Sequence, residues 1–475
     1  MKKKRVFWPP ILNVDITAMA AEGRCVARHE GQVIFVSGVA PGDRVDLRIT
    51  KAQKNYLEAV PTAFHQFSEE RVEPFCQHFG VCGGCKWQHI AYDAQLRHKQ
   101  QQVEDALRRI GKVVDLPSIL PILPSEQTRY YRNKLEFSAS PNAWLTAEQI
   151  ASGETFDRRV LGFHAPGRFD KIVDIEHCHH QPDPSNALRL RVREFAREAN
   201  MSFYDAVSQR GCLRLLIIRT AETTGETMVI VQVQTPVAPE SPAVLGNLLA
   251  MLQAEFPAIT SLHYVINDKG NDTFHDLEVI TVKGPGYIHE RMEDLVFRVG
   301  PKSFYQTNAR QALRLYQLTR ELAQLTPDDL VYDLYTGAGT IANFVARQAR
   351  HVVGVEYVEQ SILDARINSQ INGIANTTFY AGDMKDVLTA DLLARHGAPD
   401  VVITDPPRAG MHPDVVARLL EAAPRRIVYV SCNPATQARD LELLGADYRV
   451  SVVQPVDMFP HTYHVENVAV LERRS

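Results

Sequence analysis

The sequence predicts an α/β protein whose C-terminal part is a doubly wound, mostly parallel sheet. From about residue 300 onward, strand-like and helix-like segments alternate, which is typical of helices that cross over between parallel strands. A Gly-rich turn follows the first of these strands. Near the N-terminus the pattern differs, because short strands separated by Gly turns are typical of a small β-barrel. We therefore expect three domains, at residues 1–62, 63–300 and 301–475.

Length and charge limit the class of protein. With 475 residues the chain can hold several cores, and its net charge of −4 argues against a uniformly basic nucleic-acid binder but not against local basic patches. One such patch is the run Lys2, Lys3, Lys4 and Arg5. No apolar stretch approaches the roughly 20 residues that span a membrane, and no signal peptide opens the chain. We expect a cytoplasmic monomer without a membrane partner, and the 7 cysteines do not indicate a disulfide framework.

The predicted elements of the first two domains follow from periodicity. In the barrel, residues 33–36 read as a buried strand and residues 44–49 alternate with period two. A cysteine-rich segment at 75–90 precedes an amphipathic helix that ends at Gly111. Its predicted apolar face consists of Leu96, Val103, Leu107 and Ile110. Residues 123–300 read as an α+β domain, in which strands at 213–219 and 228–234 form a hairpin.

The C-terminal domain supplies the predicted parallel sheet. Its strands are expected at 330–335, 352–356, 378–380, 401–404 and 427–431, with further strands near 448–453 and 465–471. Helical periodicity is present between them, at 341–350 and 361–371 for example.

A cofactor site is predicted where the first of these strands meets its helix. The turn contains Asp333, Tyr335, Gly337, Gly339 and Thr340. Glycines there let the backbone approach a ligand closely, although a Gly-x-Gly turn alone can also be just a tight turn. Glu356, at the end of the second strand, can accept both hydroxyls of a ribose, and Asp383 is placed to meet an adenine amine. This set fits a nucleoside without a diphosphate and favours S-adenosylmethionine over NAD.

Three further residues predict the chemistry. Cys432 follows a buried strand, Asp405 opens an Asp-Pro-Pro-Arg turn, and Glu466 comes late in the chain. A thiol, an acidic turn and a late carboxylate beside such a cofactor favour methyl transfer to C5 of a pyrimidine. The thiolate would add to C6 and so activate C5, and a base would then remove the C5 proton.

These residues resemble motifs of the RNA uracil-5 methyltransferases. The matching segments are 302–308, 333–340, 405–410, 431–436 and 457–466. The resemblance implies a Rossmann-like class I methyltransferase domain in which Cys432 is the nucleophile and Glu466 is the base. It also implies that Asp405 contacts the flipped uracil or the methyl donor, and that Phe304 stacks on the target base. The implied cofactor contacts are Gln306, Tyr335, Glu356 and Asp383. Thr340 departs from the Asn of some members, which should alter one cofactor contact only.

A metal site is predicted by the cysteine-rich segment. Cys76, Cys82 and Cys85 have the spacing C-x5-C-x2-C, and Cys178 is the best candidate for a fourth ligand. Spacing alone leaves open an iron–sulfur cluster or zinc, the latter with His177, His179 or His180 as an alternative ligand. The resemblance favours a branch of the family with a [4Fe-4S] cluster, for which we expect a structural role that joins this segment to the central domain.

The same branch has an N-terminal RNA-binding barrel, the OB-like TRAM domain, which residues 11–62 resemble. We expect the basic N-terminus and basic side chains of the barrel to contact phosphates. The basic barrel residues are Arg24, Arg28, Arg44, Arg48, Lys51 and Lys54. Arg132 and Lys134 lie among aromatic residues that would line the RNA path, unless the segment is an ordinary amphipathic strand.

Together these patterns predict methylation of uridine C5 in RNA, with 23S ribosomal RNA as the first candidate and rRNA processing as the role. The same reaction on tRNA is the nearest alternative. It ranks second because tRNA enzymes of the family often lack the barrel and the cysteines. An adenine amino-methyltransferase would need neither Cys432 nor Glu466, and the cofactor loop argues against a non-enzymatic iron–sulfur RNA-binding protein.

Overall fold

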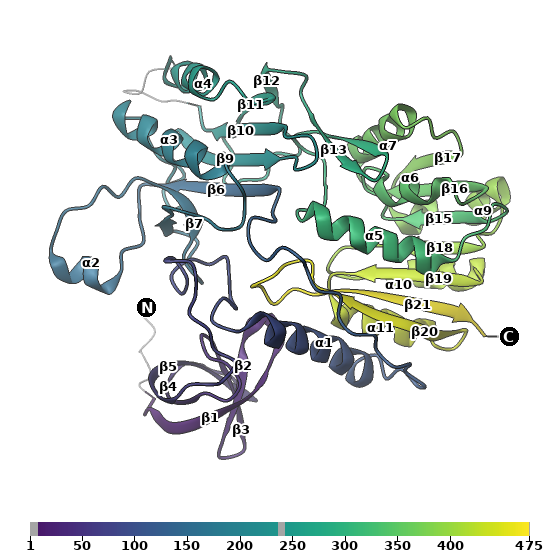
Figure 1. Cartoon of the computed structure of the whole chain (residues 1–475), viewed down its shortest axis with the longest axis horizontal. Helices are drawn as coiled ribbons and strands as arrows, with labels where there is room; N and C mark the ends of the chain where they lie inside the picture. Colours follow the sequence, from purple (N-terminus) through teal and green to yellow (C-terminus); the bar gives the residue numbers. More distant parts are fainter. Residues whose placement is uncertain (1–7, 236–242, 475) are drawn as a thin grey trace.

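The computed structural model of the chain describes residues 8–235 and 243–474. The basic run Lys2, Lys3, Lys4 and Arg5 lies outside the described residues. Figure 1 shows the N-terminal barrel at the lower left, a central sheet above it and a second large sheet to the right. None of the helices in the described ranges is both long and apolar enough to cross a membrane.

The N-terminal strands form the expected barrel, which is closed in the order β1-β2-β3-β5-β4. Its strands are β1 (Ile11–Met19), β2 (Cys25–His29), β3 (Gln32–Val36), β4 (Arg44–Ala52) and β5 (Tyr56–Gln66), with a short 3-10 turn, η1 (Ala21–Gly23), after β1. Apolar side chains alternate along β4, so that Val45 and Leu47 are buried and Arg44 and Arg48 are exposed. This period of two lets one face of each strand fill the barrel interior.

Helix α1 (Tyr92–Arg109) links the cysteine-rich segment to the rest of the chain and packs against α11 and β20. Val103 and Leu107 are buried as predicted. Ile110 is 45% exposed, which contradicts the predicted apolar face. The buried positions in fact follow i+4 spacing through Gln95, Lys99, Val103 and Leu107, so one stripe of the helix faces the protein although two of its members are polar.

The central part of the chain forms a seven-stranded sheet in the order β12-β11-β10-β9-β6-β7-β8, which α3 and α4 cover (Figure 1). The strands are β6 (Lys134–Ser140), β7 (Val160–His164), β8 (Ile172–Asp174), β9 (Leu213–Thr220), β10 (Thr227–Val233), β11 (Ser261–Ile266) and β12 (Ile280–Lys283). The helices are α2 (Ala147–Ser152), α3 (Ser185–Glu198) and α4 (Ala243–Glu255). The predicted hairpin is confirmed, since β9 and β10 pair antiparallel and Thr220 opposes Thr227.

Between the two sheets lies the strand pair β13 (Ile288–Met292) and β14 (Leu295–Val299), followed by α5 (Ala309–Ala323). The strand pair packs against α7 of the C-terminal sheet through β14. Phe297 of β14 and Leu315 of α5 belong to one apolar cluster that continues into the C-terminal sheet. This shared core fixes the segment that connects the two sheets.

The C-terminal part is a Rossmann-like sheet in the order β17-β16-β15-β18-β19-β21-β20. Its strands are β15 (Leu330–Leu334), β16 (His351–Glu356), β17 (Thr377–Ala381), β18 (Val401–Thr404), β19 (Arg426–Ser431), β20 (Tyr448–Val456) and β21 (Glu466–Arg473). The helices are α6 (Thr340–Ala346), α7 (Glu359–Ile371), α8 (Met384–Val387), α9 (Ala390–His396), α10 (Pro413–Ala422) and α11 (Pro434–Leu444). Strands β15 to β19 run parallel, whereas β21 pairs antiparallel with both β19 and β20.

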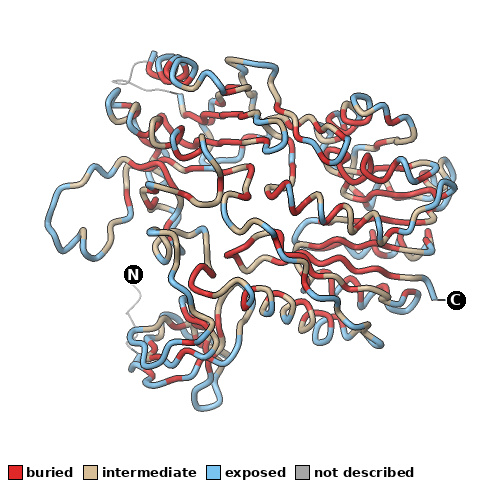
Figure 2. The backbone as a smooth tube through the Cα atoms, viewed as in Figure 1, coloured by how far each residue is buried: buried red, intermediate tan, exposed pale blue. Residues whose placement is uncertain are grey.

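Burial follows this architecture. Figure 2 shows long buried stretches along the strands of both large sheets. Because strands β15, β18 and β19 are covered on both faces, their residues form near-continuous apolar runs rather than alternating ones. The helix predicted at 341–350 ends at Ala346, and Arg350 instead donates its backbone N–H to Asp329 O.

Candidate active site

Three sequence-predicted residues meet at one edge of the C-terminal sheet. Asp405 follows β18 and Cys432 follows β19, and the carboxyl ends of parallel neighbours share an edge. Strand β21 runs the opposite way, so its first residue, Glu466, begins at that same edge. The register places Asn467 opposite Ser431, which brings Glu466 level with Cys432.

Burial and mutual repulsion set the protonation of these groups. Burial and, secondarily, the carboxyls of Glu466 and Asp405 raise the pKa of Cys432 to about 11. Burial raises the pKa of Asp405 to about 7, and burial together with Asp405 raises that of Glu466 to about 8. The Arg408 guanidinium opposes both the thiol and the Glu466 shifts. Two carboxyls that titrate near neutral pH can each give or take a proton during a reaction.

The Gly-rich loop after β15 has a backbone with several positive φ angles. Tyr335, Gly337 and Gly339 all have positive φ, at 63°, 56° and 72°. A Cβ on Gly339 would lie 2.8 Å from the Ala365 Cβ, so glycine there permits close packing against α7. A Cβ on Gly337 would meet no atom within 4 Å. A non-glycine residue held at positive φ, as Tyr335 is, is frequent at functional sites.

Acidic groups of this region fit a nucleoside ligand. Glu356 accepts hydrogen bonds from the backbone N–H groups of Gly337 (3.2 Å) and Val358 (2.9 Å) and remains half-buried. Asp333 is fully buried, and its Oδ1 has no hydrogen-bond partner. Burial raises the pKa of Asp333 to about 7. An unpartnered buried carboxyl oxygen beside the loop is a candidate for a ligand amine or hydroxyl.

The remaining predicted cofactor residues lie at the starts of helices or just before them. Thr340 opens α6 and is buried, and Asp383 caps α8 by accepting the Lys385 N–H at 3.2 Å. Gln306 precedes α5, and its backbone carbonyl accepts a 2.9 Å hydrogen bond from the Asn133 side chain. Phe304, the predicted stacking residue, is 66% exposed. It is therefore free to meet a base.

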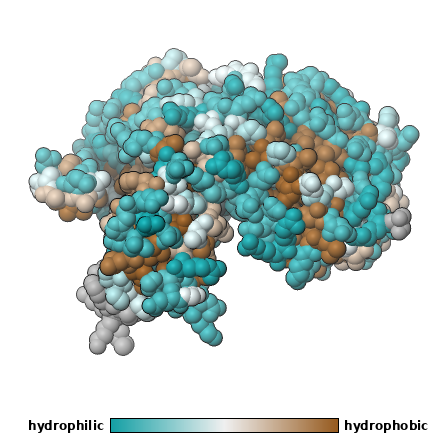
Figure 3. All heavy atoms as spheres, turned by 60° about the horizontal axis from the view of Figure 1, so that its bottom comes forward, coloured by the Kyte–Doolittle hydropathy of each residue, from teal (hydrophilic) through white to brown (hydrophobic). Residues whose placement is uncertain are grey.

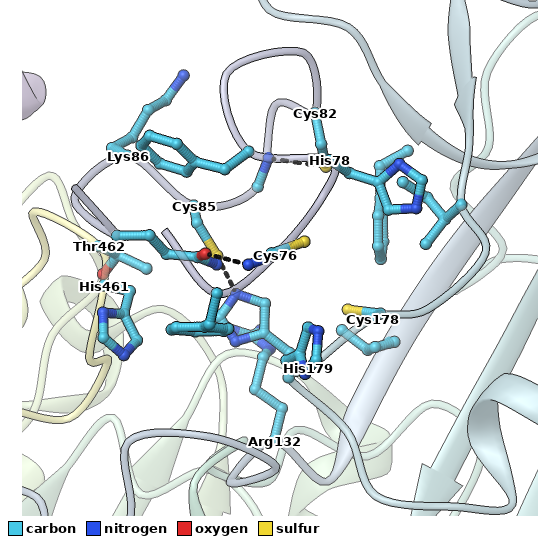
Figure 4. A pocket seen from close by; sticks show the side chains of 18 of the residues that line it. Cys76, His78, Cys82, Cys85, Lys86, Arg132, Cys178, His179, His461 and Thr462 are labelled. Carbon is cyan, nitrogen blue, oxygen red and sulfur yellow. Dashed lines mark hydrogen bonds between the residues drawn. The ribbon is translucent and has the colours of Figure 1, made fainter. Parts of the chain in front are cut away.

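The four predicted metal ligands line one cavity. This cavity has a volume of about 400 Å³. Figure 4 shows Cys76, Cys82, Cys85 and Cys178 around it, with His461 and Thr462 at its side. Cys85 Sγ lies 2.9 Å from His180 Nε2, although the two residues are 95 positions apart in the sequence. The cysteine-rich segment therefore contacts the central domain at this cavity. Arg132 and Lys134, predicted to contact RNA, also line this cavity.

The four cysteines are free thiols whose ionised form is disfavoured by burial. Burial raises the pKa of Cys82 to about 11 and that of Cys85 to about 12, and neighbouring cysteines add to both shifts. Burial therefore favours the protonated thiols, and a metal would have to bind them as thiolates. Within the described residues, no group of three or more His, Cys, Asp and Glu side chains could hold a metal ion.

The loop between β20 and β21, residues 457–465, lies in the segment 457–466 that resembles a family motif, and it runs from this cavity to the sheet edge where Glu466 begins β21. We call it the base loop because it leads into Glu466. The backbone N–H groups of Lys86 and Trp87 both donate to His461 O, at 3.0 and 3.1 Å. The other end of the loop approaches the sheet edge of Asp405, Cys432 and Glu466, where His464 Nε2 lies 3.5 Å from Arg408 Nη2.

Candidate RNA-contacting groups of the barrel fall into two sets. Arg24, Arg44 and Lys51 form ion pairs with acidic neighbours, whereas Arg28, Arg48 and Lys54 are exposed. Figure 3 shows a mostly hydrophilic face with hydrophobic patches. An exposed aromatic pair that the sequence analysis missed also lies on this part of the chain. Phe64 and Phe67 stack with centroids 5.1 Å apart beneath the Arg71 guanidinium.

Comparison with known proteins identifies similar chains. Residues 285–474 match the family model described as tRNA (uracil-5-)-methyltransferase, and residues 11–62 match the TRAM domain. An uncharacterized RNA methyltransferase of Bacteroides thetaiotaomicron is 56% identical over 96% of this chain and 100% of its own. One from Chlorobaculum tepidum is 40% identical over 98% of this chain and 96% of its own.

A solved structure extends the similarity to the whole fold. The Pyrococcus abyssi tRNA (uracil-54, C5)-methyltransferase, in complex with S-adenosyl-L-homocysteine, superposes with a TM-score of 0.74 at 29% identity. The match covers 96% of this chain and 100% of that one.

Proposed function

We propose that this chain, which belongs to the S-adenosylmethionine-dependent RNA (uracil-5-)-methyltransferases, methylates a uridine of 23S ribosomal RNA through a covalent adduct on Cys432. The observation that carries the proposed mechanism is the meeting of Asp405, Cys432 and Glu466 at one sheet edge.

The proposed reaction begins with addition. The target uracil must leave its stack before Cys432 Sγ can reach C6. The thiol first gives its proton to solvent, and the thiolate then bonds to C6, which moves the electron pair of the C5–C6 double bond onto C5 and O4. Asp405, whose pKa lies near 7, is partly protonated at neutral pH and donates a hydrogen bond to the uracil oxygen where negative charge develops.

S-adenosylmethionine, when bound, supplies an electrophilic methyl group to the activated C5. The residues that would hold it are Gln306, Asp333, Tyr335, Gly337, Gly339, Thr340, Glu356, Asp383 and Asp405. The unpartnered Asp333 oxygen and the open space above Gly337 support this assignment.

Glu466 completes the proposed reaction as the base. It removes the C5 proton, the C–H electron pair re-forms the C5–C6 double bond, and Cys432 leaves as the thiolate. A carboxyl with a pKa of about 8 is a stronger base than an ordinary glutamate, which suits removal of a carbon-bound proton. Phe304, Arg132 and Lys134 are proposed to contact the RNA, Phe304 by stacking on a base.

Two classes of RNA are candidates for the substrate. The N-terminal barrel and the four cysteines are the reasons for placing 23S rRNA first. Transfer RNA is the second candidate, and a specific observation favours it, because the similar Pyrococcus abyssi protein is by its name a tRNA methyltransferase and matches 96% of this chain.

Deleting the gene and mapping 5-methyluridine in both RNAs decides between these candidates. We expect a uridine of 23S rRNA to lose its methyl group while tRNA keeps its own. Complementation with wild type should restore the methyl group, and complementation with Cys432→Ala should not. Loss confined to tRNA would reject the ribosomal substrate without affecting the proposed chemistry.

We further propose that Cys76, Cys82, Cys85 and Cys178 hold a [4Fe-4S] cluster that fastens the cysteine-rich segment to the central domain. A cluster held by four thiolates neutralises charge that burial otherwise opposes. Methyl transfer needs no redox step, so the proposed role is structural.

Protein purified without oxygen should contain about four irons and four sulfides per chain. Replacing any one of the four cysteines with Ser should remove most of the iron and the visible absorption. The matched control is Cys25→Ser, since Cys25 is a buried free thiol that lies in the barrel core. Zinc without iron in the wild-type protein would overturn the cluster assignment.

A further inference from the structure

Helix α1 holds the base loop through two buried polar contacts that the proposed reaction does not explain. The first is an ion pair in which Lys99 Nζ lies 2.6 Å from Asp457 Oδ1, with both side chains 0% exposed. Tyr92 OH donates to the other Asp457 oxygen at 2.6 Å, and Lys99 also donates to Phe459 O at 3.0 Å. A buried ion pair is weak evidence for stability, because desolvation offsets its attraction. It does, however, connect Asp457 and Phe459 of the base loop to α1.

The second contact is a two-point clamp by Gln95, which is also 0% exposed. Gln95 Oε1 accepts the His461 backbone N–H at 2.9 Å, and Gln95 Nε2 lies 3.1 Å from His461 Nδ1. The same Nε2 donates to Trp87 O and Ile90 O. His461 has a φ of 63°, a backbone state that non-glycine residues adopt only where the surroundings enforce it. The clamp, together with the Lys86 and Trp87 N–H groups on His461 O, provides that enforcement.

The held loop also borders the segments that surround the reacting groups. Met458 O accepts a 2.9 Å hydrogen bond from the side-chain N–H of Asn308, which lies two residues after Gln306. Pro460 O accepts the Tyr131 hydroxyl at 3.0 Å. The loop therefore touches α1, the cysteine-rich segment and the start of α5 before it delivers Glu466, which is 4% exposed.

We propose that Gln95 and Lys99 are positioning residues for the elimination step: they hold the base loop so that Glu466 stays covered and directed at C5 of the adduct. This inference rests on the proposed role of Glu466. The two residues touch neither substrate nor cofactor, and they act through His461 and Asp457. A misplacement of about 1 Å can slow a catalytic step by about a hundredfold. Loosening the loop should therefore slow release of the adduct more than its formation.

The test is Gln95→Met, which keeps the length of the side chain and removes all its hydrogen bonds. Turnover should fall about tenfold or more, and a covalent protein–RNA band should accumulate on a denaturing gel. The control is Gln101→Met on the exposed face of the same helix, where Gln101 donates a hydrogen bond to Asp105, and it should behave as wild type. Damage to the fold alone would lower the melting temperature and adduct formation together.

Lys99→Met alone would leave the buried Asp457 carboxylate without its partner charge, which would destabilise the fold. The paired variant Lys99→Met with Asp457→Asn removes the ion pair without leaving a charge, and it should accumulate adduct as Gln95→Met does. Normal turnover in both variants, or lost turnover without accumulated adduct, would overturn the inference. If Glu466→Gln itself accumulates no adduct, the proposed role of Glu466 fails first, so the two failures are distinguishable.

Discussion

Replacing Cys432 with Ala is expected to lower RNA methylation by a thousandfold or more, on the order of what loss of a catalytic nucleophile costs. Without the thiol, C6 receives no nucleophile and C5 stays unreactive towards the methyl donor. Binding of S-adenosylmethionine should stay within about twofold of wild type, because the cofactor loop follows β15 and not β19. Methyl incorporation from labelled donor and calorimetry of donor binding measure the two quantities.

A matched variant guards against a general effect of cysteine loss. Cys25→Ala removes a buried thiol from the barrel core, far along the chain from the reacting edge, and methylation should stay near wild type. Turnover by Cys432→Ala within tenfold of wild type would exclude the covalent mechanism.

Replacing Glu466 with Gln is expected to stall the enzyme as a covalent adduct and to lower turnover by about a hundredfold to ten-thousandfold, the range for loss of a general base. The carboxamide keeps the size of the side chain but cannot take the C5 proton. A slow-migrating protein–RNA band should therefore build up on a denaturing gel, and it should disappear when Cys432 is also changed.

The control for this variant lies on the same strand. Glu472→Gln alters a carboxylate at the far end of β21, where it pairs with Arg426 and Arg449, and no adduct should accumulate. In wild type, release of the adduct should rise with pH and level off above about 8, because Glu466 acts as the carboxylate and is protonated below its raised pKa. Normal RNA binding by Glu466→Gln without any band would assign the base to another group.

Much of this fold follows from local sequence patterns. The barrel, the hairpin of β9 and β10, and the alternating C-terminal strands were predictable because period-two and period-3.6 patterns are local signals. The meeting of Asp405 and Cys432 was also predictable, since each follows a strand of the predicted parallel sheet, whereas the position of Glu466 depends on the direction of β21. The antiparallel insertion of β21 between β19 and β20 was not, because strand order depends on long-range pairing.

The anchoring of the base loop escaped the sequence analysis for a physical reason. Gln95 and His461 are 366 residues apart, and no local pattern links them. One signal was nevertheless present. Gln95 and Lys99 share the i+4 stripe of Val103 and Leu107, so two polar residues interrupt the buried face of α1. The predicted apolar face instead included Ile110, which lies past the helix end and is half-exposed. The buried stripe through Gln95 and Lys99 was therefore not recognised.

The central claim is that Cys432 bonds to C6 of a uridine that then receives a methyl group at C5. Wild-type protein incubated with S-adenosylmethionine and RNA containing 5-fluorouridine tests it most directly, because fluorine replaces the proton that Glu466 would remove. Mass spectrometry of the digested complex should find a methylated fluorouridine attached to the peptide that contains Cys432. A methylated RNA without any covalent complex, or a complex attached through another residue, would contradict the account.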